Sequence, residues 1–241
     1  MPETNDKTPE TTSTTPVPAA KKPRVLTPYS IEAILMRAEL ALKGHQSDAD
    51  IQSAMTPFNY DTAAIKALTD QLSAARALVA ATTQSRGAQQ GTTQQVKDAF
   101  SEAKSATATF ALVCRELLKK EPGALASLGL TGGAAPQALA AFLLYADNLF
   151  TNALSAPATV KAILAARGYD TVRLTAEKVK IDSLRTANQA QEQAKGTAQN
   201  LTPQQKQTLT DLDSAVMTYR KLARRALKTR PQLLEKLGIK A

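Results

Sequence analysis

The sequence lacks several residue types on which common protein architectures depend. It has no Trp, one Cys and one His in 241 residues, and aromatic side chains make up only 4% of it. A single Cys excludes an internal disulfide framework, so no oxidising compartment is required. Runs of aromatic and β-branched residues, which strands need, are scarce. The remaining composition, rich in Ala, Thr, Gln and Leu, predicts an all-α protein.

Long apolar runs are also missing. No stretch reaches the length of about 18 apolar residues that a membrane span needs, and the N-terminus has no apolar signal-peptide core. We therefore expect no membrane span and a cytoplasmic location. Residues 1–27 are rich in Pro, Thr and charge, which predicts a disordered tail because so few apolar side chains are available for burial.

The rest of the chain contains an internal repeat with an offset of 109 residues. Between residues 60–131 and 169–240, 22 of 72 aligned positions are identical, without a gap. The same offset continues upstream more loosely, where it pairs Leu35 with Leu144 and Leu40 with Leu149. The sequence thus predicts a tandem duplication with four segments: the tail 1–27, repeat 1 at 28–131, a linker at 132–136, and repeat 2 at 137–241.

Helix-capping signals recur at the paired positions. Asp61 and Asp170 are suited to N-caps, and Pro122 and Pro231 to the first turns of short helices. Each copy then reads as two shorter helices, two long ones and a terminal turn. In repeat 1 we expect the helices at 29–43, 47–56, 61–86 and 93–121.

The predicted long helices carry apolar seams with heptad-like spacing, and a polar hairpin is expected between them. Gly87 and Gly196 each follow a basic residue, as at a helix C-terminus, and Thr202 with Pro203 matches a capping box. Two arrangements fit this pattern. Each copy closes its own up-and-down four-helix bundle, or the four long helices share one bundle with the short helices at one end.

A search for catalytic or metal-binding chemistry finds no convergent set of residues. His45 lies in a polar connector without a second His, which favours a surface loop residue. Cys114 lies in an apolar seam and is aligned with Ala223, which favours a buried small side chain. Glu32 and Glu39 share a helix face but lack the Glu-x-x-His elements of di-iron proteins. We therefore expect no enzyme, no cofactor and no metal.

The most distinctive feature is a basic stripe near the C-terminus. Residues 219–241 contain eight basic residues and one acidic residue, out of a net charge of +9 for the whole chain. At 100° per residue, one helix face collects five candidate residues for binding an anion or a partner: Arg220, Lys221, Arg224, Arg225 and Lys228.

The repeat provides an internal comparison for this stripe. The aligned residues of repeat 1 are Ala111, Leu112, Arg115, Glu116 and Lys119. The shared Arg115 and Arg224 are therefore expected to serve the fold, whereas Arg220, Lys221 and Arg225 are not explained by it. The stripe fits a solvated structural face, a surface for an acidic protein, or a phosphate-binding surface for nucleic acid.

The run RKLARRALKTRPQLLEKLGI, residues 220–239, with its echo LVCRELLKKEPGALASLGL in repeat 1, resembles the C-terminal signature of a group of bacterial proteins. These are Ala-rich helical chains of unassigned function that end in a similar Pro-Gln-Leu-Leu-Glu, Leu-Gly pattern. The resemblance covers about twenty residues. It implies a bacterial, all-helical protein and carries over no site residue.

Three functional hypotheses follow. The first is a non-enzymatic structural or protein-interaction module, with self-association as one option. The second is sequence-independent binding of a polyanion such as nucleic acid through the basic C-terminal helix. The third is an enzyme or small-molecule carrier, which requires a cavity between helices.

Overall fold

The computed structural model describes residues 28–240, and every regular element among them is a helix. The predicted all-α class is confirmed, and the predicted disordered tail lies outside the described residues. The elements are α1 (Pro28–Ser47), α2 (Ala49–Met55), the 3₁₀ turn η1 (Thr56–Phe58), α3 (Thr62–Leu117), α4 (Pro122–Ser127), α5 (Leu139–Ser155), α6 (Ala158–Ala165), α7 (Thr171–Ala226) and α8 (Pro231–Lys236).

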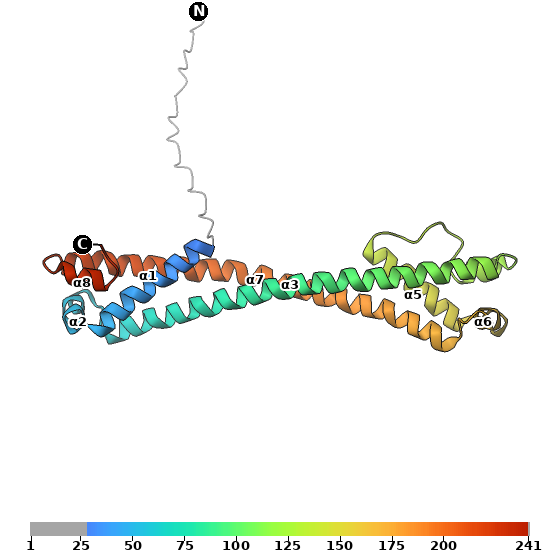
Figure 1. Cartoon of the computed structure of the whole chain (residues 1–241), viewed down its shortest axis with the longest axis horizontal. Coiled ribbons are helices and arrows are strands. Elements are labelled where there is room, and N and C mark those ends of the chain that lie inside the picture. The colour runs from blue at the N-terminus through green and yellow to red at the C-terminus, as the bar shows by residue number, and fades with distance from the viewer. Residues whose placement is uncertain (1–27, 241) are drawn as a thin grey trace, which may run out of the picture.

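Two long helices run the length of the molecule. Helices α3 and α7 have 56 residues each and cross in the middle of an elongated rod (Figure 1). They are antiparallel, because the start of α3 packs with the end of α7, and the reverse holds at the other end. We call these ends the α1 end, which also contains α2 and α8, and the α5 end, which also contains α4 and α6.

The predicted hairpins at the middle of each copy are wrong, since both segments are helical throughout. Gly87 and Gly196 lie inside α3 and α7, and neither is among the glycines with positive φ. Thr202 does not cap a helix; its hydroxyl donates to the carbonyl of Ala198, one turn back in α7. Pro203 is an interior residue of that helix.

Each end has its own apolar core, and each core takes side chains from both predicted copies. The α5 end combines α5, α6 and the first half of α7 with the second half of α3. The α1 end combines α1, α2 and the first half of α3 with the second half of α7 and α8. The arrangement differs from both predicted bundles, because the described chain has two long helices rather than four.

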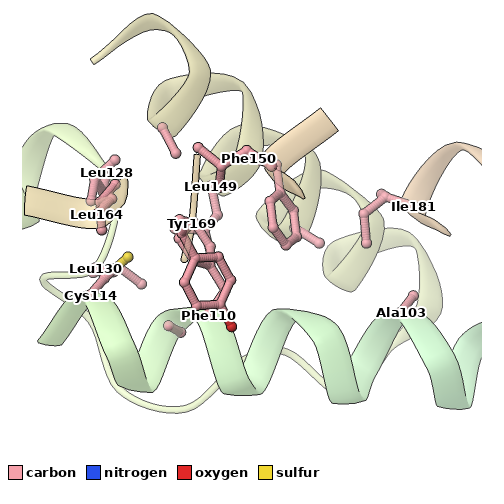
Figure 2. Packing of buried hydrophobic residues seen from close by; sticks show 14 of the residues in the cluster. Ala103, Phe110, Cys114, Leu128, Leu130, Leu149, Phe150, Leu164, Tyr169 and Ile181 are labelled. Atoms are coloured by element: carbon pink, nitrogen blue, oxygen red, sulfur yellow. The ribbon is translucent and has the colours of Figure 1, made fainter. Parts of the chain in front are cut away.

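The core of the α5 end is built around aromatic rings (Figure 2). Phe110 of α3 stacks on Phe150 of α5, with ring centroids 5.0 Å apart, and lies equally close to Tyr169. Cys114 is fully buried one turn further along α3, which confirms its prediction as a core residue. Burial raises the pKa of its thiol to about 12, so it is a poor nucleophile.

Helix boundaries near the paired capping signals agree with the sequence. The carboxylates of Asp61 and Asp170 accept from backbone N–H groups of the first turns of α3 and α7, at 2.8 Å in both cases. Pro122 and Pro231 open α4 and α8.

The middle of the rod is a two-helix segment with a polar interior. Thr82, Ser85 and Gln205 are buried there. The amide of Gln191 on α7 donates to the hydroxyl of Thr93 on α3 at 3.0 Å. Because such side chains contribute little apolar burial, the two end cores supply most of the apolar packing of the rod.

Helices α1 and α5 match one another with an offset of 108, not 109. Buried residues of α1 (Ile34, Ala38, Ala41, Leu42, His45) have buried counterparts 108 positions later (Phe142, Ala146, Leu149, Phe150, Ala153). The predicted pairing of Leu40 with Leu149 is therefore wrong by one residue, since Leu40 is exposed and Leu149 is buried. The reason is a connection between α5 and α6 that is one residue longer than that between α1 and α2.

Candidate functional site

Four of the predicted basic residues lie on the last turns of α7, at the α1 end of the rod, and Lys228 lies in the turn that follows this helix. Lys221, Arg224, Arg225 and Lys228 are exposed. Arg220 is half-buried, and its guanidinium donates to the carbonyl of Gly238, just after α8, at 2.9 Å.

Acidic residues of α2 and its N-cap neutralise two other cations of the C-terminal region. Lys236 pairs with Asp48 at 2.7 Å, and Arg230 pairs with Asp50 at 3.3 Å. By contrast, the side chains of the four exposed residues of the stripe make no hydrogen bond or ion pair with any other residue between 28 and 240. The fold thus leaves the side chains of three cations of α7 and of Lys228, just after it, unpaired within the described chain.

The stripe continues onto α1 through a cluster of like charges. Partial burial lowers the pKa of Arg220, and the neighbouring guanidinium groups of Arg37 and Arg224 lower it further. Arg37, on α1, pairs with Asp213 of α7 at 2.7 Å. Arg220 is therefore close to two other guanidinium groups, of which that of Arg37 is paired with a carboxylate. Such a group of cations attracts anions.

The structural roles of the aligned arginines differ in part from the prediction. Arg115 donates to the carbonyl of Gly133 at 3.1 Å, in agreement with its expected role in the fold. The side chain of its counterpart Arg224 makes no such bond. Arg220, which the comparison of the repeats left unexplained by the fold, instead donates to the backbone of the turn after α8. Arg224 therefore joins Lys221 and Arg225 as a side chain that the fold leaves unexplained.

His45 contradicts the prediction of a surface loop residue. It lies in α1, is 4% exposed, and its Nδ1 is 3.1 Å from the hydroxyl of Tyr219 on α7. Tyr60 meets the ring of Tyr219 edge-on, with centroids 5.0 Å apart. Sequence reasoning missed this cluster because its members lie in three distant segments of the chain.

A cavity of about 450 Å³ adjoins this cluster. His45, Tyr60 and Ile65 line it. Polar side chains from the end of α1, from α2, η1 and α3, and from the N-cap of α3 complete the lining: Gln46, Gln52, Thr56, Asp61, Thr62, Lys66 and Thr69. Neither Glu32 nor Glu39 is part of this lining. Glu39 instead pairs with Arg76 and, at 2.6 Å, with Lys43, which holds the pKa of its carboxyl below the ordinary value.

The stability of the protein is expected to fall as the pH drops from 7.5 to 5.5. Burial lowers the pKa of His45 below its ordinary value of 6.5, so the folded state favours the neutral ring. As the pH falls below 6.5, His45 becomes protonated in the unfolded chain before it does in the folded protein. The free energy of unfolding therefore decreases between pH 6.5 and the lower folded pKa, by at most about 1.4 kcal/mol per pH unit. Urea denaturation at both pH values measures this change.

The control for this pH dependence is His45→Ala, which introduces the residue found at the matching position of α5, Ala153. The chain has no other His, and the carboxyl groups with lowered pKa (Glu39, Asp48, Asp147) titrate at more acidic pH. The variant should show no loss between pH 7.5 and 5.5. An unchanged slope in the variant would assign the effect to another group.

Comparison of the chain with protein-family models, with curated proteins and with solved structures finds no match. Within residues 28–240, no helix is both long and apolar enough to cross a membrane, and no three His, Cys, Asp or Glu side chains are grouped to hold a metal ion. A functional assignment must therefore follow from the geometry of the chain's own residues.

Proposed function

We propose that this chain is a non-enzymatic structural and protein-interaction module, in which two related helical bundles are held apart by a rod. The observation that carries the proposal is the pair of uninterrupted helices α3 and α7, each of which joins the core of one end to the core of the other. At 1.5 Å per residue, a helix of 56 residues extends about 84 Å.

We further propose that the two bundles descend from one duplicated unit. Helices α3 and α7 begin and end at positions 109 apart, and so do α4 and α8. An ion pair between Glu39 and Arg76 at the α1 end has a counterpart between Asp147 and Arg185, 3.3 Å apart, at the α5 end. Such a molecule offers two similar but differently charged ends to its surroundings, which suits a cytoplasmic spacer or scaffold.

One observation favours a second function, sequence-independent binding of a polyanion. The side chains of Lys221, Arg224 and Arg225 at the end of α7, and of Lys228 in the turn after it, are exposed without partners among the described residues. Phosphates are attracted to such a row of cations irrespective of base sequence. Stacking of bases on aromatic side chains has little support, since the chain is poor in aromatic residues.

The spacer proposal is tested by the distance between two spin labels on α3. Cysteines introduced at the exposed Lys66 and Glu116 carry the labels, in a background where the buried Cys114 is replaced by Ala. The 50 residues between them correspond to about 75 Å of helix. A distance below about 20 Å, as a hairpin at the middle of α3 would give, would overturn the proposal.

A further inference from the structure

Beside the basic stripe, the α1 end exposes several large apolar side chains. Met36 and Leu40 of α1 are 57% and 46% exposed, and Met217 of α7 is 36% exposed. Met36 and Leu40 are one helical turn apart on α1 and so share a face. Exposed side chains of this size are common singly, but become informative when they gather.

Close contacts connect these side chains with Arg37 and Arg220. The guanidinium of Arg37 lies 3.8 Å from the sulfur of Met217. Arg220 binds the carbonyl of Gly238, and a Cβ placed on Gly238 would lie 3.2 Å from Cδ1 of Leu40. Met36 shares the face of α1 with Leu40, and Arg224 lies one turn after Arg220 on α7. We call this group of residues the Met–Arg patch: Met36, Arg37, Leu40, Met217, Arg220 and Arg224.

A hollow extends the patch towards α8. Leu40 lines a shallow depression of about 600 Å³, together with Lys43, Gly44 and Lys236. Helix α8 approaches α1 closely there, because a Cβ on Gly44 would meet the carbonyl oxygen of Lys236 at 2.5 Å. An apolar side chain from a partner has room beside Leu40, while the ammonium groups of Lys43 and Lys236 are paired with Glu39 and Asp48.

The opposite end of the rod does not reproduce this combination. The positions matching Met36, Leu40 and Met217 hold Leu144, Asn148 and Ala108, so only one of these three positions has an exposed large apolar side chain. The positions matching Arg37, Arg220 and Arg224 hold Tyr145, Ala111 and Arg115. Because the α5 end packs without the combination, the architecture does not require it.

We propose that the Met–Arg patch is a docking surface for an acidic amphipathic helix of a partner protein. Apolar side chains of such a helix would cover Met36, Leu40 and Met217, and its carboxylates would meet Arg220 and Arg224. Methionine side chains adapt readily to different apolar partners, and arginine binds carboxylates through two parallel hydrogen bonds. Laying one amphipathic helix into an apolar groove is a common mode of recognition.

The chemistry of the patch discriminates against other occupants. A nucleic acid would gain nothing from covering Met36 and Leu40. An anionic membrane would normally be entered by a broader apolar face with Trp or Phe, and the patch has neither. A second copy of this chain brings its own net charge of +9 against the arginines.

The test is a fluorescence-anisotropy titration of the full chain with a fluorescein-labelled peptide that has Leu at helical positions i, i+3 and i+7 and Glu on the flanks. A scrambled peptide of the same composition, a single-stranded oligonucleotide of equal charge and phosphatidylserine-containing vesicles run in parallel. Two variants are compared with the unmodified chain. The first removes the apolar side chains of the patch (Met36→Gln/Leu40→Gln/Met217→Gln), and the second removes two of its positive charges (Arg220→Gln/Arg224→Gln).

We expect the amphipathic peptide to bind at least about tenfold more tightly than the scrambled one, and each variant to weaken it by about tenfold or more. The matched variants of the other end, Leu144→Gln and Arg115→Gln, should change affinity by less than about twofold. A milder variant, Met36→Gln/Arg224→Glu, alters two exposed side chains only and should also weaken binding if the larger changes disturb folding.

Three outcomes would overturn the proposal. Equal binding of both peptides and the oligonucleotide, insensitive to the apolar variant, would make the surface a general polyanion site. Binding of vesicles but not of the peptide would make it a membrane surface. Absence of peptide binding would overturn the proposed docking surface. This inference rests on the proposed function as an interaction module. The spacer proposal is tested separately, and a distance of about 75 Å between the two spin labels would support it even if the peptide does not bind.

Discussion

Replacing Phe110 by Ala is expected to lower the free energy of unfolding by about 3–5 kcal/mol, as for other large-to-small changes of fully buried aromatic residues. Phe110 has no exposed surface and contacts rings from two other segments, Phe150 and Tyr169. Truncation removes apolar burial and leaves a cavity that these rings are too constrained to fill. Denaturant unfolding measures the loss.

The same variant tests whether each end core combines side chains of both predicted copies. Phe110 belongs to predicted repeat 1, but its contacts lie at the α5 end. Hydrogen exchange should therefore accelerate in α5 and α6, with less effect in α1 and α2. Leu112→Ala, on the same helix but at a side chain 64% exposed, is the control and should cost less than about 0.5 kcal/mol. Greater loss of protection in α1 and α2 would mean that repeat 1 folds as a unit of its own.

Ala88→Pro is expected to cost about 3 kcal/mol or more, because proline in a helix interior removes a backbone hydrogen bond and clashes with the preceding turn. Ala88 lies at the middle of α3, an exposed position in the two-helix part of the rod. Few apolar contacts there can compensate for a broken turn. Thermal unfolding and circular dichroism measure the effect.

A matched control places proline where the same helix accepts it. Thr62 is the first residue of α3, and the preceding Asp61 has the extended conformation (φ −79°, ψ −178°) that a following proline requires. Thr62→Pro should change stability by less than about 0.5 kcal/mol. If Ala88→Pro proved as stable as the unmodified chain, residues 87–92 would be a connection between two helices, as the glycines alone suggest.

The error over the hairpins has a specific cause in the sequence. Gly87 and Gly196, each after a basic residue, predict helix ends, although glycine in a helix interior costs only about 1 kcal/mol. A contrary signal was present. The apolar seams ending at Val79 and resuming at Val96 are separated by two heptads plus three residues, so they share one register across the polar segment. A hairpin would not need that continuity.

The candidate site was partly accessible from the sequence. The basic face of α7 follows from residue spacing, and the comparison with repeat 1 identified Lys221 and Arg225 as unexplained by the fold. Sequence spacing did not reveal that Arg220 holds the turn after α8, or that Arg37 and Met217 lie beside one another. These contacts join residues separated by up to 180 positions, and no local pattern encodes them.

By itself the sequence determined that this protein is helical and that one helix face is basic. It also determined where four helices begin: α3 and α7 after their Asp caps, and α4 and α8 at their prolines. These properties depend on composition, capping and spacing within a few turns, which act locally. Only the tertiary structure decided that the long helices continue through their polar middles, that His45 is buried, and that each core takes side chains from both predicted copies. Those outcomes depend on which distant apolar surfaces meet, because burial in the end cores outweighs the weak local preference of glycine for ending a helix.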